Sequence, residues 1–191
     1  MPGVRRRGAE LEAAISDAVV GLVLAGGPSA VTMEAVAARA GTSKPVLYRR
    51  WPDRAALLRD VLLRQAAGVI PAEDTGSYRT DMLAILRGWA GVLTGPGARV
   101  VHAVVSAMGD DPDFAAAFRD GVIGWRKREM ADLLARGVAR GDVRPDVPVE
   151  LARELGQGVL WHRFLITGDP IDDAVVVQIV DEVLVPFVAP R

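Results

Sequence analysis

The stretch that most constrains this fold is residues 31–58, where capping and turn residues fix two short helices at a set spacing. Thr32 precedes an apolar run of helical period and is a favourable N-cap. Gly41 follows that run and can adopt the left-handed conformation that ends a helix. Ser43 then caps a second helix with Pro45 in its first turn, where a missing N–H costs nothing. Two short helices joined by a turn of about three residues make a helix-turn-helix.

The second helix and its surroundings are basic. Between positions 39 and 59 the chain has six basic residues and one acidic residue, Asp53. The basic residues are Arg39, Lys44, Arg49, Arg50, Arg54 and Arg59. A phosphate backbone attracts such an excess of positive charge. This pattern alone leaves two interpretations open, a DNA-binding motif or an ordinary helical hairpin with a solvated basic face.

The motif matches a known family. The run TMEAVAARAGTSKPVLYRRWPDRAALL, residues 32–58, resembles the DNA-binding domain of the TetR family of transcriptional regulators. The similarity is close over about residues 9–60 and covers the remainder in architecture and length. The resemblance implies an all-α protein of about nine helices. An N-terminal three-helix head carries the helix-turn-helix, and a C-terminal helical body serves ligand binding and dimerisation.

The resemblance also implies the functional division and the DNA contacts. Residues 1–52 would form the DNA-binding domain, and residues 53–191 the ligand-binding and dimerisation domain, with 53–69 as a linking helix. The expected partner is double-stranded DNA with a palindromic operator, bound by a homodimer formed through the last two helices. The expected contact residues are Thr32, Thr42, Ser43, Lys44, Pro45, Val46, Tyr48, Arg49, Arg50 and Arg54. Lys44 can bind guanine and Pro45 and Val46 can pack on thymine methyl groups, whereas the Thr, Tyr and Arg side chains mainly suit phosphates.

Members of this family bind a small molecule in the body, and its binding lowers operator affinity. The resemblance therefore implies a small-molecule effector and favours a repressor. The candidate ligand contacts are Met82, Leu86, Trp89, His102, Met108, Phe118, Trp125, Trp161 and His162. Each Trp or Met at this spacing is also consistent with plain core packing. Together these side chains indicate an apolar effector.

Apolar periodicity predicts the remaining helices. They cover residues 9–24, 53–69, 78–93, 99–108, 112–140, 149–167 and 172–188. The last is expected to be interrupted near Pro186, because proline removes a backbone hydrogen bond. Its run VVVQIVDEVLVPFV is apolar on more than one side, so it needs burial on two sides. A dimer interface provides that burial.

Composition disfavours an enzyme or a metalloprotein. The chain has no cysteine and two histidines, so it lacks a disulfide framework, a thiolate zinc site and a cysteine nucleophile. No glycine-rich phosphate loop or HExxH motif is present, and no cofactor, metal site or catalytic residue is predicted. A helical scaffold protein that no longer binds DNA is the alternative function. It would carry a neutral second helix, whereas residues 44–50 keep their basic side chains.

Charge is distributed unevenly along the chain. The net charge is −1, but the first 60 residues carry +3 and the remainder −4. The basic arm at residues 2–8, with Arg5, Arg6 and Arg7, is either a solubilising tail or a source of further phosphate or minor-groove contacts. An amphipathic helix follows it rather than an apolar segment, so it is not a signal peptide. No apolar run reaches membrane-spanning length, and a cytoplasmic location is expected.

Overall fold

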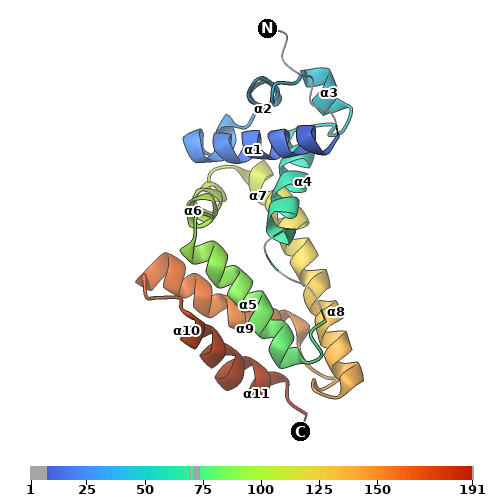
Figure 1. Ribbon diagram of the computed structural model, residues 1–191, viewed down its shortest axis with the longest axis vertical. Coiled ribbons are helices and arrows are strands. Elements are labelled where there is room, and N and C mark those ends of the chain that lie inside the picture. The colour runs from blue at the N-terminus through green and yellow to red at the C-terminus, as the bar shows by residue number, and fades with distance from the viewer. Residues whose placement is uncertain (1–7, 69, 71–73, 191) are drawn as a thin grey trace. The chain divides into compact units, whose positions relative to one another are not determined.

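The computed structural model describes residues 8–68, 70 and 74–190. Within these residues all regular structure is helical, in nine continuous helices, which confirms the predicted all-α class. The chain forms two compact units (Figure 1). One comprises the described part of Met1–Gln65 with Ala98–Ile123, and the other comprises Ala66–Gly97 with Gly124–Arg191. The division at residue 52 concerns function rather than packing, and it stays a prediction.

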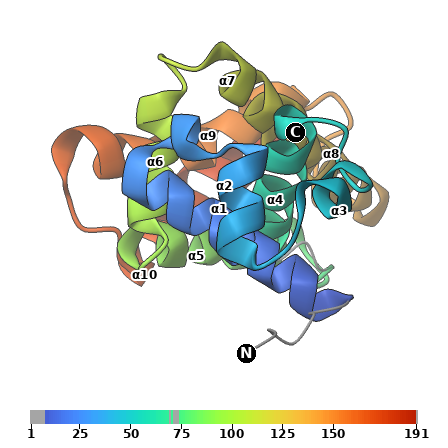
Figure 2. The same cartoon turned by 90° about the horizontal axis from the view of Figure 1, so that it is seen from above.

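The first unit contains the helix-turn-helix. Its elements are α1 (Ala9–Gly26), the short 3-10 turn η1 (Pro28–Ala30), α2 (Met33–Ala40), α3 (Lys44–Tyr48), α4 (Arg54–Ala67), α6 (Ala98–Ala107), α7 (Pro112–Phe118) and η2 (Arg119–Ile123). Helix α2 packs against α1 (Figure 2). The core of the first unit contains one fully buried side chain from each of the first four helices, namely Ile15, Val36, Leu47 and Leu57.

The helix predicted over residues 112–140 is continuous but not uniform. Helix α7 passes through η2, a π-helical segment, into α8 (Gly124–Arg140). A π-helical turn contains one more residue than an α-helical turn, so it shifts the phase of everything after it. Trp125, a candidate ligand contact or core residue, is therefore only half-buried, and Arg126 occupies the buried position with 2% exposure.

A glycine in this π segment permits a close helix contact within the first unit. A Cβ atom on Gly121 would lie 2.8 Å from Cγ and 3.1 Å from the carbonyl oxygen of Arg59 in α4. Real Cβ atoms essentially never lie within 3.0 Å of another heavy atom, and a contact of 3.1 Å is tighter than nine in ten of those they make. The backbone of η2 thus approaches the backbone of α4 only because position 121 has no side chain.

The second unit is made of four continuous helices. They are α5 (Tyr78–Thr94), α8, α9 (Val149–His162) continued by η3 (Arg163–Thr167), and α10 (Asp173–Gln178) continued by η4 (Ile179–Leu184) and α11 (Val185–Val188). The predicted interruption near Pro186 is wrong, because helix runs through it to Val188. The π-helical segment η4 precedes this proline and changes the hydrogen-bond pattern at the point where an α-helix would lose a bond.

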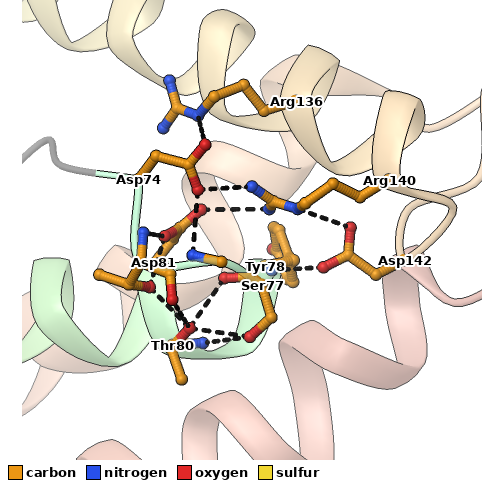
Figure 3. A network of polar contacts seen from close by, with 10 residues as sticks. Asp74, Ser77, Tyr78, Thr80, Asp81, Arg136, Arg140 and Asp142 are labelled. Carbon is orange, nitrogen blue, oxygen red and sulfur yellow. Dashed lines mark hydrogen bonds and ion pairs between the residues drawn. The ribbon is translucent and has the colours of Figure 1, made fainter.

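A network of polar contacts joins the beginning of α5 to the end of α8 (Figure 3). Asp81, which is 1% exposed, accepts hydrogen bonds from the backbone N–H of Thr75 at 2.7 Å and from its hydroxyl at 2.6 Å. Arg140 places Nη2 3.3 Å from Asp81 and Nη1 2.7 Å from Asp74. Its Nε lies 3.5 Å from Asp142. A buried carboxylate is thereby paired and hydrogen-bonded, as burial of charge requires.

No helix among the described residues is both long and apolar enough to cross a membrane.

Candidate nucleic-acid interface

The turn between α2 and α3 has the geometry expected from its sequence. The Thr32 hydroxyl accepts a hydrogen bond from the Ala35 N–H at 3.1 Å and caps α2. Gly41 has φ 68° and lies in the left-handed region. The Thr42 N–H then donates to the Ala37 carbonyl at 2.9 Å, which completes a Schellman-type helix end. These contacts set the direction in which the chain enters α3.

Ser43 occupies the predicted N-cap position of α3. Its backbone is extended and its carbonyl accepts from the Val46 and Leu47 N–H groups at 3.0 and 3.2 Å, so it does occupy the N-cap position. Its side chain, however, makes no capping hydrogen bond to any described residue. The exposed hydroxyl stays outside the helix.

Most of the predicted DNA contacts lie on the surface of this motif. The exposed ones are Thr32, Ser43, Lys44, Pro45, Tyr48, Arg49 and Arg50, and the half-buried ones are Thr42, Val46 and Arg54. Leu47 is 0% exposed while its neighbour Tyr48 is 51% exposed. One face of α3 is thus held in the core, and the opposite face presents polar and basic groups to solvent.

Two of the three exposed cations of this segment already have acidic partners. Lys44 Nζ forms an ion pair with Glu34, and the hydrogen bond and charge of that carboxylate raise the pKa of Lys44. Arg50 Nη1 lies 2.5 Å from Glu12 Oε1. Arg49 has neither an ion pair nor a side-chain hydrogen bond to any described residue. An anion that binds at α3 can therefore pair with Arg49 directly, whereas at Lys44 and Arg50 it must compete with the carboxylates of Glu34 and Glu12.

Arg54 has an internal role that the sequence did not predict. Its Nε donates to the Val31 carbonyl at 2.8 Å, and its Nη2 donates to the Pro28 carbonyl at 2.8 Å and to Asp111 at 2.7 Å. Asp111 also caps α7 by accepting from the Phe114 N–H at 2.9 Å. The hydrogen bond from Arg54, followed by that from Phe114, lowers the pKa of Asp111. Phosphate contact by Arg54 stays a prediction, and the arm with Arg5, Arg6 and Arg7 lies outside the described residues.

The candidate ligand contacts are divided between the two units. In the first unit His102 is exposed, and Met108 and Phe118 are half-buried. In the second unit the buried members are Met82, Leu86 and Trp89, the half-buried ones are Trp125 and Trp161, and His162 is exposed. Within this second set the structure brings Trp89 and Trp161 together, with ring centroids 5.9 Å apart. No group of three or more potential ligand side chains that could hold a metal ion occurs in the part of the chain that the structure describes.

A capped helix, a tight glycine turn and a short helix with one buried and one basic face define a helix-turn-helix DNA-binding protein. Comparison with known proteins gives the family. The model for bacterial regulatory proteins of the tetR family matches residues 15–61, and the model for the tetracyclin repressor-like C-terminal domain matches residues 72–183. The chain belongs to the TetR family of transcriptional regulators. It is a DNA-binding regulator and not an enzyme.

Several relatives match nearly the full chain. The HTH-type transcriptional regulator YdeS of Bacillus subtilis is 32% identical over 87% of this chain and 84% of its own length. A DNA-binding transcriptional repressor, TetR, of Mycobacteroides abscessus is 31% identical over 96% of this chain and 97% of its own. The TetR family regulator SCO0332, whose crystal structure is known, is 35% identical in sequence. Its structure matches 95% of this chain and 100% of its own chain, with a TM-score of 0.73.

Proposed function

We propose that this protein is a homodimeric transcriptional repressor that binds a palindromic operator through α3 and is released when a small molecule binds its body. The observation that carries the proposal is the two-faced α3, with Leu47 buried at 0% exposure and Tyr48 exposed at 51%. The M. abscessus relative, which is named a repressor, supports the direction of regulation. Family membership supports dimerisation and an effector.

Recognition would use the exposed face of α3 in the major groove. Lys44 suits a guanine edge, and Pro45 and Val46 suit thymine methyl groups. Tyr48, Arg49 and the hydroxyl of Ser43 suit phosphates on either side. On binding, Lys44 would exchange its Glu34 partner for a base, so part of its interaction energy with DNA would be offset by the lost ion pair.

An apolar stripe on α9 and η3 supports dimerisation through the last two helices. Ala152, Gly156 and Leu160 on the other side of α9 are buried within the subunit. Large apolar side chains are left exposed along the end of the chain, namely Leu151 at 45%, Val159 at 37%, Leu165 at 38%, Ile166 at 73% and Val183 at 38%. A second copy that covers this stripe would remove it from water, which is the usual reason for a patch of this kind.

The effector would act by reciprocal coupling. A ligand lowers operator affinity only by as much as DNA lowers affinity for the ligand. The aromatic pair Trp89 and Trp161 gives the second unit an apolar surface suited to a flat or aliphatic ligand. The linking role predicted for residues 53–69 would carry the change to α3.

The test is a gel-shift assay of the purified dimer on DNA from around its own gene, across a salt series. We expect saturable binding to one palindromic fragment and its loss in Tyr48→Ala. Replacing Arg49 with Ala should reduce the slope of log affinity against log salt by about 1, since one phosphate contact disappears. Arg99→Ala is the matched control, because Arg99 is also exposed but lies on α6, outside the motif.

Weak binding that is equal on all fragments and unchanged in Tyr48→Ala would contradict the proposal. The same holds if Arg49→Ala and Arg99→Ala alter the salt slope equally. Either result would favour the helical scaffold, and the next experiment would be a search for a protein partner.

A further inference from the structure

The second unit contains a buried cation without an acceptor. Arg126 is 2% exposed, and its Nε, Nη1 and Nη2 atoms have no hydrogen-bond partner in the described part of the chain. A guanidinium does not lose its proton in proteins, so this buried group is charged. Its guanidinium carbon lies 5.1 Å from the ring centroid of Trp125, and a cation–π contact offsets only part of the cost of burial.

Helix α9 adds further donors of the same kind. Arg153 Nε and Gln157 Nε2 are buried and have no acceptor among the described residues. The other end of the Arg153 guanidinium is held by Glu150 at 3.0 Å and Glu154 at 2.7 Å, so only one edge is free. These two side chains and Trp161 are spaced four residues apart and lie on one face of α9.

An ion pair beside Arg126 links α8 to this face, because Lys127 Nζ lies 3.4 Å from Glu150 Oε2, and the same Glu150 oxygen lies 3.0 Å from Arg153. Burial lowers the pKa of Arg126, the carboxylate of Glu129 raises it, and the positive charge of Arg153 lowers it. Glu129 acts through its charge without a hydrogen bond to Arg126. No carboxylate among the described residues forms an ion pair or a hydrogen bond with Arg126.

The other end of the face is aromatic. Trp161 pairs with Trp89 at 5.9 Å between ring centroids, and the buried Trp89 Nε1–H also has no acceptor in the described chain. Eight residues separate Arg153 from Trp161, which is about 12 Å along a helix. The face therefore has a cationic end, an amide donor and an aromatic end, where Trp89 of α5 adds an indole donor.

We propose that α5, α8 and α9 form a binding site for a small organic acid. Its carboxylate would lie at Arg126 and Arg153, and its apolar part would lie beside Trp89 and Trp161. The inference rests on the proposed function, because it gives the chemical class of the effector. It refines the apolar effector predicted from the sequence by adding an acidic group. Every unsatisfied atom named above is a donor, and a carboxylate supplies acceptors only.

The test compares acids with their neutral amides on the full-length dimer. Octanoate, decanoate, benzoate and 2-naphthoate are each titrated beside the matching primary amide, by calorimetry and by thermal shift. At least one acid should bind about ten- to a hundredfold more tightly than its amide, the range expected for a hydrogen bond to a charged group. That preference should disappear in Arg126→Gln. Arg128→Gln is the control, because Arg128 lies on the same helix and is exposed.

Two further measurements keep the test decisive. Arg126→Gln removes an unpaired buried charge, so the free protein should melt at the same or a higher temperature. Trp89→Phe keeps the aromatic ring and removes the indole N–H, and should weaken acid binding less than Arg126→Gln does. If no acid is preferred over its amide, or if Arg128→Gln loses the preference as well, the acid site is wrong.

Failure of the site and failure of the proposed function give different results. Binding of the wild-type dimer to its operator is measured without ligand and tests the repressor. Operator binding with no preference for acids would reject the acid site alone. Acid binding without release of the operator would support the site and reject release by the effector.

Discussion

Replacing Asp81 with Asn should destabilise the second unit although the two side chains have the same shape. Asp81 is 1% exposed, and one oxygen accepts from the N–H and hydroxyl of Thr75 at 2.7 and 2.6 Å. An amide oxygen can keep both bonds. The other oxygen lies 3.3 Å from Arg140 Nη2, where the amide NH2 of Asn would set a donor against a donor (Figure 3).

The expected loss is about 2 kcal/mol. Removal of one partner from a buried ion pair costs roughly 3–5 kcal/mol. Two effects reduce that value here, because Arg140 keeps Asp74 at 2.7 Å and because the variant no longer buries a carboxylate. Asp74→Asn is the matched control. It also removes a charge from Arg140, but the Asp74 side chain is 50% exposed, so its loss should be at most about 1 kcal/mol.

Urea unfolding followed by tryptophan fluorescence measures both values. All variants are compared at one protein concentration, since dimerisation makes stability depend on concentration. A lower midpoint with an unchanged slope would report lost stability rather than a changed unfolded state. If Asp74→Asn lowered the free energy of unfolding as much as Asp81→Asn, burial would not set the cost of breaking this network, and the reasoning would be refuted.

Three further predictions concern packing, pH and assembly. Gly121→Ala should cost about 1–3 kcal/mol, because its Cβ would lie 2.8 Å from a side-chain carbon of α4, and thermal unfolding would show it. The pKa of Asp111 is lowered by Arg54, so this pair contributes stability above the ordinary carboxyl pKa of 3.8 and loses it as pH falls. Asp111→Asn should therefore show a flatter loss of stability between about pH 5 and 3 than wild type in acid titrations of urea midpoints. Ile166→Glu should shift the dimer towards monomer in sedimentation, whereas Leu24→Glu, at an exposed apolar site in the first unit, should not.

The helix-turn-helix was predictable because its key residues have local conformational demands. Thr32 provides a hydroxyl for a free N–H, and Gly41 adopts a φ of 68° that other residues rarely take. Neither demand depends on distant parts of the chain. Ser43 takes the predicted N-cap position without a side-chain hydrogen bond, because the backbone position of a cap does not force the side chain to bond.

The internal role of Arg54 was beyond local reasoning. Its partner Asp111 lies 57 positions further along the chain, and its other acceptors are backbone carbonyls of Pro28 and Val31. Periodicity and capping rules describe neighbours on one element. They carry no information about which elements meet in space, so an exposed phosphate contact and an internal hydrogen bond look alike in sequence.

The partial exposure of Trp125 was also beyond local reasoning. The π-helical segment at Arg119–Ile123 adds a residue to the helical turn, and no residue type predicts such a segment. A signal was nevertheless present. Arg126 is four residues from the buried Val122 and four from the buried Met130, so it occupies a core position of the helical repeat. A charged residue in such a position is a candidate for a functional role, because charged groups perturbed by burial cluster at functional sites.

The two buried charged residues of the second unit thus differ in their hydrogen-bond partners. Asp81 has a full set of partners, and this network holds the beginning of α5 to the end of α8. Arg126 has no hydrogen-bond acceptor among the described residues and only a cation–π contact with Trp125, so the free protein is less stable than its core would allow. On the proposed acid site, a ligand that supplies the missing acceptor adds its binding free energy to the stability of the conformation that it selects. A ligand shifts a conformational equilibrium only through a difference in affinity between the two conformations, so the acid would act as an effector only by binding one of them more tightly.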